Sequence, residues 1–216
     1  PKIDTIYNFD ALTLLRLLPD ESVHCVVTSP PYFNLRDYGT ASWEDGDPDC
    51  DHKIPASTLG GGSNKGHKGS FESNYKAICG KCGARRVDGQ IGLEPTPAEY
   101  VAALVAVFRE VCRVLRSDGT FWLNIGDSYA NDGKWGGSTG GKHVDVLHGN
   151  SGVGRTRKNT GFKAKDRMMI PARLAIALQD DGWWLRSMAP WVKRSAMPES
   201  TTDRPTTATE YIFLLT

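Results

Sequence analysis

A short apolar run that leads directly into two prolines constrains this chain more than any other feature. Residues 23–27 are mostly β-branched and apolar, which is typical of a parallel strand covered on both faces. Thr28-Ser29-Pro30-Pro31-Tyr32 follows at once, and its prolines fix φ and remove two backbone donors. The sequence therefore predicts a buried strand that ends in a stiff turn at the carboxyl edge of a sheet, where open α/β folds bind ligands.

The turn after this strand offers the groups that an amino-bearing aromatic ring requires. The Ser29 hydroxyl and the Pro30 carbonyl can accept hydrogen bonds from an exocyclic amine, and the ring of Tyr32 can stack on the flat heterocycle. The alternative for Tyr32 is ordinary packing beneath a loop. Its position after two prolines at a strand end favours the binding role.

Helix and strand signals alternate along the chain. Asp10 can cap a short helix, and Thr96-Pro97-Ala98-Glu99 combines a capping box with proline at the first helical position. The expected elements are a strand at 3–7, a helix from 10 to 18, the strand at 23–27, a helix at 96–115, a strand at 120–125, a helix at 171–181, and strands at 184–191 and 211–215. This alternation predicts a doubly wound α/β sheet.

The composition is that of one soluble domain with an unevenly placed charge. The chain has 216 residues, 39% hydrophobic content and no long apolar stretch, so neither a membrane span nor a signal peptide is expected. The net charge is +1, yet residues 134–167 hold eight basic residues against two aspartates. The basic ones are Lys134, Lys142, Arg155, Arg157, Lys158, Lys163, Lys165 and Arg167. We expect this segment to contact a phosphate backbone, and the alternative is a solvated flexible loop.

Two insertions separate the expected elements. One covers residues 34–92, and the other, a mobile loop rich in glycine, lysine and arginine, covers residues 130–166. Both are longer than the connections of compact domains usually are. Each leaves from the carboxyl end of a predicted strand, so we expect them to wrap around a substrate larger than a metabolite.

The first insertion carries a candidate zinc site. Cys50 and His52 precede a Cys-x-x-Cys knuckle formed by Cys79 and Cys82. Three thiolates and one imidazole complete a closed tetrahedral Zn²⁺ site, which argues against zinc doing the chemistry. The alternatives are a redox Cys-x-x-Cys pair or unrelated surface thiols. Cys25 and Cys112 lie in an apolar strand and an apolar helix, so both are interpreted as core residues.

These motifs together resemble a known family. The Thr28–Tyr32 turn, the preceding Leu18-Pro19-Asp20-Glu21-Ser22-Val23, Leu123-Asn124-Ile125-Gly126-Asp127, Trp191-Val192-Lys193 and Met197-Pro198-Glu199-Ser200 are similar to those of β-class DNA amino-methyltransferases. Members come from restriction-modification systems and phages, and they transfer a methyl group from S-adenosylmethionine to the exocyclic nitrogen of cytosine or adenine. The resemblance implies a Rossmann-like methyltransferase sheet, double-stranded DNA as substrate, a possible restriction endonuclease partner and a cytoplasmic location in a prokaryotic or phage-infected cell.

The resemblance also implies which residues form the site. The catalytic set is Ser29, Pro30, Pro31 and Tyr32; the expected substrate contacts are Phe33, Asn124, Asp127, Trp191 and Lys193; and the expected cofactor contacts are Asp10, Thr28 and Ser29. For Asp10, a simple helix cap is an equally good interpretation. An aromatic amine is a poor nucleophile, so two hydrogen-bond acceptors must turn its lone pair toward the methyl group, and the base must first flip out of the duplex.

The glycine-rich cofactor motif of this family is not found. The glycines at 60–62 and 149–154 follow no predicted strand. We therefore expect the chain to be the catalytic part of a longer protein, with the remaining half of the domain as a partner. Alone, it should bind S-adenosylmethionine weakly, methylate nothing and expose a sheet edge that promotes association.

The target base is left open between two alternatives. Serine at the first motif position favours N4 of cytosine, and N6 of adenine is the alternative, because serine occurs in both groups of the resembled family. A non-catalytic, zinc-containing DNA-binding module is a further alternative, and it would not need the Pro-Pro-Tyr turn. A small-molecule or protein methyltransferase is disfavoured by the two insertions and the basic segment.

Overall fold

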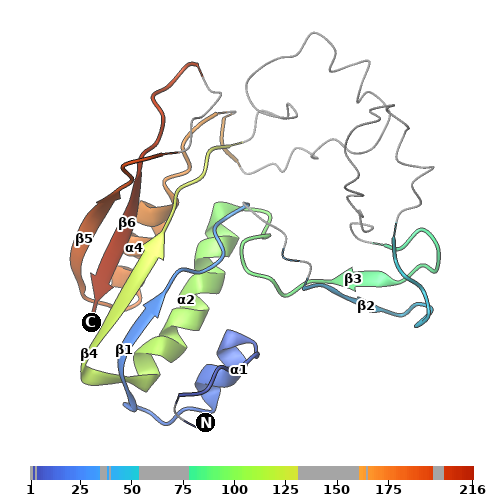
Figure 1. Cartoon of the computed structure of the whole chain (residues 1–216), viewed down its shortest axis with the longest axis horizontal. Helices are drawn as coiled ribbons and strands as arrows, with labels where there is room; N and C mark the ends of the chain where they lie inside the picture. The colour runs from blue at the N-terminus through green and yellow to red at the C-terminus, as the bar shows by residue number, and fades with distance from the viewer. Residues whose placement is uncertain are drawn as a thin grey trace.

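A mixed four-stranded sheet forms the centre of the structure. The computed structural model describes residues 2, 4–34, 38, 40–53, 78–130, 161–163, 165–196 and 202–216. The strands are β1 (Val23–Thr28), β4 (Leu115–Ile125), β6 (Thr209–Leu215) and β5 (Leu185–Val192), in that spatial order. β1 runs parallel to β4, whereas β6 runs antiparallel to both β4 and β5 (Figure 1). Four of the predicted strands are thereby confirmed.

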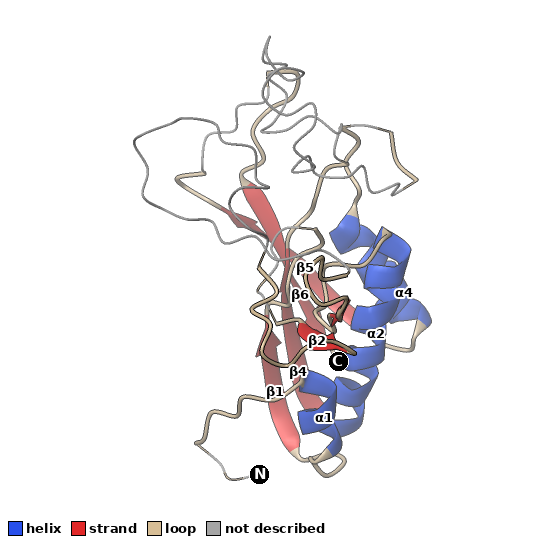
Figure 2. Ribbon diagram, turned by 90° about the vertical axis from the view of Figure 1, so that its right-hand side faces the viewer, coloured by secondary structure: helices blue, strands red, loops and turns tan. Residues whose placement is uncertain are grey.

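Three helices cover one face of this sheet. They are α1 (Ala11–Arg16), α2 (Pro97–Val114) and α4 (Ile170–Asp180), and all lie on the same side of the strands (Figure 2). The core between the layers is built from alternate residues of β4 and β6 and from the inner sides of α2 and α4. Its fully buried members include Phe121, Leu123, Ile125, Phe213, Leu215, Tyr100, Leu104, Leu174 and Leu178. No helix among the described residues is long and apolar enough to cross a membrane.

The longest helix, α2, follows from its own sequence. The Thr96 side chain accepts a hydrogen bond from the Glu99 amide at 3.2 Å, and Pro97 occupies the first helical position, as predicted. Apolar residues at spacings of three and four then face the sheet. The first turn of α2 is thus fixed locally, and burial of one side fixes how the helix lies.

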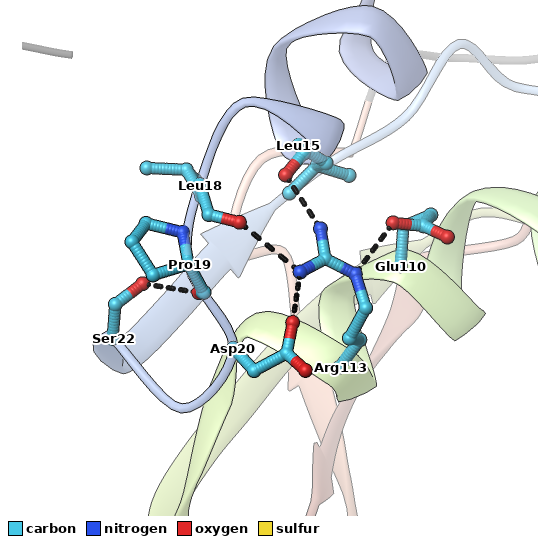
Figure 3. Close-up of polar contacts among 7 residues, drawn as sticks. All are labelled: Leu15, Leu18, Pro19, Asp20, Ser22, Glu110 and Arg113. Carbon is cyan, nitrogen blue, oxygen red and sulfur yellow. Dashed lines mark hydrogen bonds and ion pairs between the residues drawn. The ribbon is translucent and has the colours of Figure 1, made fainter.

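An arginine of α2 anchors the turn between α1 and β1. The Arg113 guanidinium donates to the carbonyls of Leu15 and Leu18 at 2.8 and 3.0 Å, and it pairs with Asp20 and Glu110 (Figure 3). The Leu15 carbonyl also accepts from the Leu18 amide at 3.0 Å, so the guanidinium adds a second bond at the end of α1 and one to the Leu18 carbonyl just beyond it. The turn therefore holds the start of β1, and with it the strand that leads into the Ser-Pro-Pro-Tyr segment, against α2.

Part of the predicted architecture is wrong. The described residues of the expected first strand, 4–7, form no strand, and Ile6 is 99% exposed there. The doubly wound arrangement is also absent from the described part of the chain, since the sheet is mixed and its helices share one face. Alternating signals predict elements but not whether two strands pair in parallel, which depends on contacts far apart in sequence.

In the part of the chain that the structure describes, the strand before the Ser-Pro-Pro-Tyr turn is covered on only one face. Val27 is 77% exposed and Cys25 is exposed, so the expectation of a strand buried on both faces is wrong in this structure. Cys112 is likewise exposed rather than a core residue. β1 also forms one edge of the sheet, which agrees with the expected open edge.

A second, smaller sheet lies in the first insertion. β2 (Ser42–Glu44) and β3 (Arg85–Val87) pair as an antiparallel two-stranded sheet set apart from the main one (Figure 1). Most of the second insertion, including five of the eight basic residues, lies outside the described residues, as do the glycines at 60–62 and 149–154 and residues 197–200. Of the described basic residues, Lys165 pairs with Asp203 and Arg167 pairs with Asp127.

Candidate active site

The Ser-Pro-Pro-Tyr turn lies at the carboxyl end of β1, beside the carboxyl end of β4. The Tyr32 hydroxyl is 2.7 Å from Asn124 Oδ1 and 3.1 Å from Glu210 Oε2. Asn124 Nδ2 donates to the Tyr211 carbonyl at 3.2 Å, which fixes the amide with its oxygen toward Tyr32. Three strands, β1, β4 and β6, therefore contribute one polar cluster to a single edge of the sheet.

Ser29 lies at the exposed rim of this cluster. Its Oγ is 3.4 Å from both the Tyr32 hydroxyl and Asn124 Oδ1, so these contacts are long and weak. A ligand with a better donor can displace them at little cost. The Ser29 hydroxyl thus lies close to Tyr32 and Asn124 without a strong hydrogen bond to either.

Packing fixes the position of the Tyr32 ring. A Cβ placed on Gly126 would lie 2.6 Å from Tyr32 Cε2, so the ring rests directly on the backbone of Gly126. Tyr100 of α2 donates its hydroxyl to the Pro31 carbonyl at 2.9 Å. The Pro31 carbonyl is therefore already engaged within the protein. Pro30 lies half-buried in the same turn.

Glu210 gives the cluster its charge. Burial alone would raise the pKa of its carboxyl, but hydrogen bonds from Lys193 and Tyr32 outweigh burial and leave the pKa below its ordinary value. Glu210 is therefore ionised at neutral pH and paired with Lys193. Burial raises the pKa of the Tyr32 hydroxyl, the bond from Ser29 opposes this, and the charge of Glu210 raises it further. Tyr32 thus stays neutral and acts as a donor and a ring, not as a base.

The lowered pKa of Glu210 predicts a pH-dependent contribution to stability. A carboxyl whose pKa is depressed by folding stabilises the native state above its unfolded pKa and loses that effect as the pH falls through the folded value. We expect Glu210→Gln to lower the free energy of unfolding at pH 7 by about 1 kcal/mol. The difference in unfolding free energy between the variant and wild type should shrink as the pH falls below 4.5, the ordinary pKa of a glutamate carboxyl. Thermal melts between pH 7 and pH 3 measure it, and a difference that does not vary with pH would contradict the assignment.

Two of the predicted substrate contacts have structural roles instead. Phe33 is 1% exposed and packs on Tyr100 with ring centroids 5.4 Å apart, so it belongs to the core and not to the open side of the site. The Asp127 carboxylate accepts from the amide of Ile170, the first residue of α4, at 2.9 Å, and from Arg167 at 2.6 Å. It therefore caps α4 from outside, as an acidic group at a helix N-terminus does.

The remaining predicted residues are dispersed around the cluster. Trp191 is half exposed on β5 and lies opposite Glu210 in the register, and Lys193 follows directly after the end of that strand. Thr28 is the last residue of β1. Asp10 caps α1, because its Oδ1 accepts from the Thr13 amide at 2.9 Å and from the Thr13 hydroxyl at 3.1 Å. The cap interpretation of Asp10 is thus confirmed, and no contact among the described residues tests its cofactor role.

Sequence reasoning missed Glu210, Tyr100 and Gly126. Glu210 carried one usable signal, an acidic side chain at the start of an apolar strand. Tyr100 looked like one more position of the apolar helix face, and its hydroxyl contact depends on how α2 packs. Gly126 stands within a family-like motif, but its close approach to Tyr32 depends on the neighbouring strand.

The four predicted metal ligands lie together in the first insertion. Cys50, His52, Cys79 and Cys82 each offer one donor atom, and these atoms all lie within 4.8 Å of one another. Three of the residues are half-buried and Cys79 is buried. The sequence spacing therefore predicted correctly which side chains meet.

Comparison with solved structures concerns the fold. The structure of the PvuII DNA methyltransferase (cytosine-N4-specific) aligns with this chain at a TM-score of 0.50 and 18% sequence identity. The alignment covers 97% of this chain and 47% of the methyltransferase. At that sequence identity the likeness shows only that the two proteins share an α/β fold.

The family follows from the sequence comparisons. A family model described as DNA methylase, N6_N4_Mtase, matches residues 23–216, and the chain belongs to this DNA methylase family. Type II methyltransferase M.XycI of Xanthomonas campestris pv. cyanopsidis is 40% identical over 98% of this chain and 54% of its own length. Type II methyltransferase M.Cfr9I of Citrobacter freundii is 38% identical over the same shares. The chain thus spans about half the length of these curated relatives.

Proposed function

We propose that this chain carries the base-binding part of a site-specific DNA methyltransferase that methylates the exocyclic amine of a flipped base. The observation that carries the proposal is the polar cluster of Ser29, Tyr32, Asn124 and Glu210 at the carboxyl end of β1 and β4. Membership of the DNA methylase family supports it. The Type II names of the relatives support a restriction-modification context with a restriction endonuclease as partner.

The chain's own groups suit the positioning of an aromatic amine. Ser29 Oγ and Asn124 Oδ1 are two acceptors that can take the two amine hydrogens, and turn the nitrogen lone pair away from the ring, once their long 3.4 Å contact with each other opens. The neutral phenol of Tyr32 presents a flat surface whose position Gly126 fixes. Stacking on that surface offsets part of the few kcal/mol that base flipping costs. The half-exposed ring of Trp191 is the proposed second contact, with Lys193 beside it.

S-adenosylmethionine is the proposed methyl donor, and the chemistry it supplies is an electrophilic methyl group. Thr28, Ser29 and Asp10 are the proposed contacts. Asp10 already uses Oδ1 as a helix cap, so only Oδ2 of its carboxylate would serve the cofactor. The described residues fit the base better than the cofactor, because the acceptors for the amine converge and the cofactor contacts do not.

The uncovered face of the sheet supports a further half of the same domain as a partner. Val27, Trp122 and Leu214 form one row across β1, β4 and β6 on the face opposite the helices. Val27 is 77% exposed and Trp122 is 38% exposed, an unusual state for apolar side chains in a central row. The curated relatives are longer than this chain. We propose that a segment corresponding to their additional residues covers this face and completes the cofactor site.

N4 of cytosine is the preferred target, with N6 of adenine as the alternative. The preference rests on serine at the first motif position, as in the resembled enzymes. The non-catalytic DNA-binding module is the competing function. It retains DNA binding but has no use for a Tyr32 hydroxyl shared between Asn124 and Glu210.

Nucleoside mass spectrometry tests the proposal. Unmethylated genomic DNA, which presents many sequence contexts, is incubated with S-adenosylmethionine and either these 216 residues or the protein extended to the relatives' length. We expect 4-methylcytosine only from the extended protein, and weak cofactor binding by the shorter chain in isothermal titration. An extended protein that binds DNA but yields neither 4-methylcytosine nor 6-methyladenine would overturn the enzymatic function.

A further inference from the structure

We propose that Cys50, His52, Cys79 and Cys82 bind one Zn²⁺ in a closed tetrahedral site that holds the first insertion together. The distances between donor atoms carry the proposal. Cys50 Sγ lies 3.8 Å from Cys79 Sγ, and Cys82 Sγ lies 3.6 Å from His52 Nδ1. Zn–S and Zn–N bonds of ordinary length at tetrahedral angles require S···S edges of about 3.8 Å and S···N edges of about 3.6 Å. Two of the six donor–donor separations therefore match the edges of a zinc tetrahedron, and all four donor atoms lie within 4.8 Å of one another.

The cysteines of this cluster are not joined as disulfides in the structure. All five cysteines of the chain are free thiols, and the Cys50–Cys79 separation is far beyond the roughly 2.05 Å of an S–S bond. The two pairs of ligands come from opposite ends of a long segment of chain. A metal that binds both pairs closes a loop of nearly thirty residues. The metal–ligand bonds offset the conformational entropy that the chain loses when this loop closes.

The backbone around the second pair forms a metal-binding knuckle. The Gly83 amide donates to the Cys79 carbonyl at 2.9 Å, and the Cys79 amide donates to the Ala84 carbonyl at 2.8 Å. Gly83 has φ of 75°, a left-handed conformation that a glycine adopts without strain. This tight turn brings both thiols of the Cys-x-x-Cys motif to the same side.

The first pair of ligands is oriented by an independent set of contacts. The His52 imidazole stacks on Trp43 of β2, with ring centroids 4.5 Å apart and an interplanar angle of 15°. His52 itself has φ of 51°, a conformation that is costly for a residue with a side chain. A Cβ on Gly46 would lie 3.0 Å from Cys82 Sγ, so this segment approaches the knuckle as closely as glycine permits.

The donor set makes the site structural. Three thiolates and an imidazole fill all four positions of Zn²⁺, so no position is left for water or substrate. Three thiolates with one Zn²⁺ leave a net charge of −1, and Lys81, between the two knuckle ligands, supplies a nearby positive charge. The same Lys81 forms a 2.6 Å ion pair with Asp51, which lies between Cys50 and His52. Both pairs of ligands are thus also joined by an ion pair.

The metal site continues into the catalytic turn through β3. After β3 the chain reaches Gly92, whose carbonyl accepts from the Asn34 amide at 2.7 Å, two residues after Tyr32. A Cβ on Gly92 would lie 3.0 Å from the Tyr32 carbonyl. The metal therefore fixes the hairpin that leaves the catalytic turn and returns to it.

Metal analysis with cobalt replacement tests the site. The protein, at full length or as these 216 residues, is purified without metal-binding tags and its zinc is measured by mass spectrometry. We expect one Zn²⁺ per chain. The Co²⁺-exchanged protein should show intense visible bands and thiolate charge-transfer absorption, both typical of tetrahedral thiolate ligation. Chelation should change the fluorescence of Trp43, because its stacking partner is a ligand.

Matched variants separate this site from adventitious thiol binding. Cys79→Ser should lose nearly all zinc, whereas Cys25→Ser and Cys112→Ser, which alter exposed cysteines outside the cluster, should retain it. His52→Cys keeps a closed donor set, so it should retain the metal and shift the cobalt spectrum toward four-thiolate ligation. The His52→Cys variant also keeps the proposal testable if Cys79→Ser fails to fold. A wild-type protein without zinc, an octahedral cobalt spectrum, or equal metal loss in Cys25→Ser would each overturn the proposal.

Discussion

Ser29→Ala and Tyr32→Ala in the full-length protein are expected to reduce methylation on the order of 10²-fold or more while leaving DNA affinity largely intact. In the proposed site, Ser29 at the rim of the polar cluster supplies an acceptor, and Tyr32 supplies the ring for stacking of the flipped base. Neither contributes charge to binding of the phosphate backbone, which dominates affinity for DNA. Methyl transfer from labelled S-adenosylmethionine and a DNA-binding titration at fixed salt concentration measure the two effects separately.

Controls within the same chain isolate the role of each group. Tyr32→Phe keeps the ring but removes the hydroxyl shared with Asn124 and Glu210, so it should lose less activity than Tyr32→Ala. Ser117→Ala and Tyr38→Ala change exposed residues of the same types outside this cluster and should behave as wild type. Wild-type methylation rates in Ser29→Ala and Tyr32→Ala would exclude the proposed catalytic turn, and an equal loss of DNA binding and methylation would show that the turn acts in DNA binding and not in methyl transfer.

Gly126→Ala is expected to produce the second large effect. The added Cβ would lie 2.6 Å from Tyr32 Cε2 and 2.9 Å from Cδ2, which is closer than packed carbon atoms approach. The ring must therefore move, and the hydroxyl must leave its position 2.7 Å from Asn124. A displacement near 1 Å at a reacting site can cost about 10²-fold in rate, so we expect a loss of that size.

The matched control for this change is Gly89→Ala. A Cβ added at Gly89 would meet no atom within 4 Å, and Gly89 lies outside the polar cluster, so this variant should retain wild-type activity. Steady-state methylation with thermal melts separates ring displacement from unfolding. A folded Gly126→Ala protein that methylates at the wild-type rate would show that the position of the Tyr32 ring does not matter for the reaction.

Local signals in the sequence predicted the elements that hold the site. The capping box at Thr96 located the start of α2, and the apolar run at 23–27 located β1 and the turn after it. The Cys and His spacing identified four side chains that the fold brings within 4.8 Å. Each of these signals is short-range, because hydrogen bonds within a turn and side-chain periodicity depend on residues a few positions apart.

Contacts between distant segments decided what the sequence could not predict. Glu210 reaches Tyr32 because β6 runs antiparallel to β4, and no local pattern specifies that direction. Phe33 was expected to face the substrate but is buried against Tyr100, and Asp127 was expected to bind substrate but caps α4. A phenylalanine or an aspartate can serve as a substrate contact or as a structural residue, and only the packing of neighbouring elements distinguishes these two roles.

The sequence by itself therefore determined the Ser-Pro-Pro-Tyr turn, the cluster of three cysteines and one histidine, the main helix and the family motifs, since each is encoded by residues close together in the chain. Only the tertiary structure decided that the described residues leave one face of the sheet uncovered, that Tyr32 rests on Gly126, and that Glu210 and Lys193 complete the polar cluster. The physical reason is that strand pairing and layer packing are set by the burial of apolar area across the whole domain, which no single segment specifies.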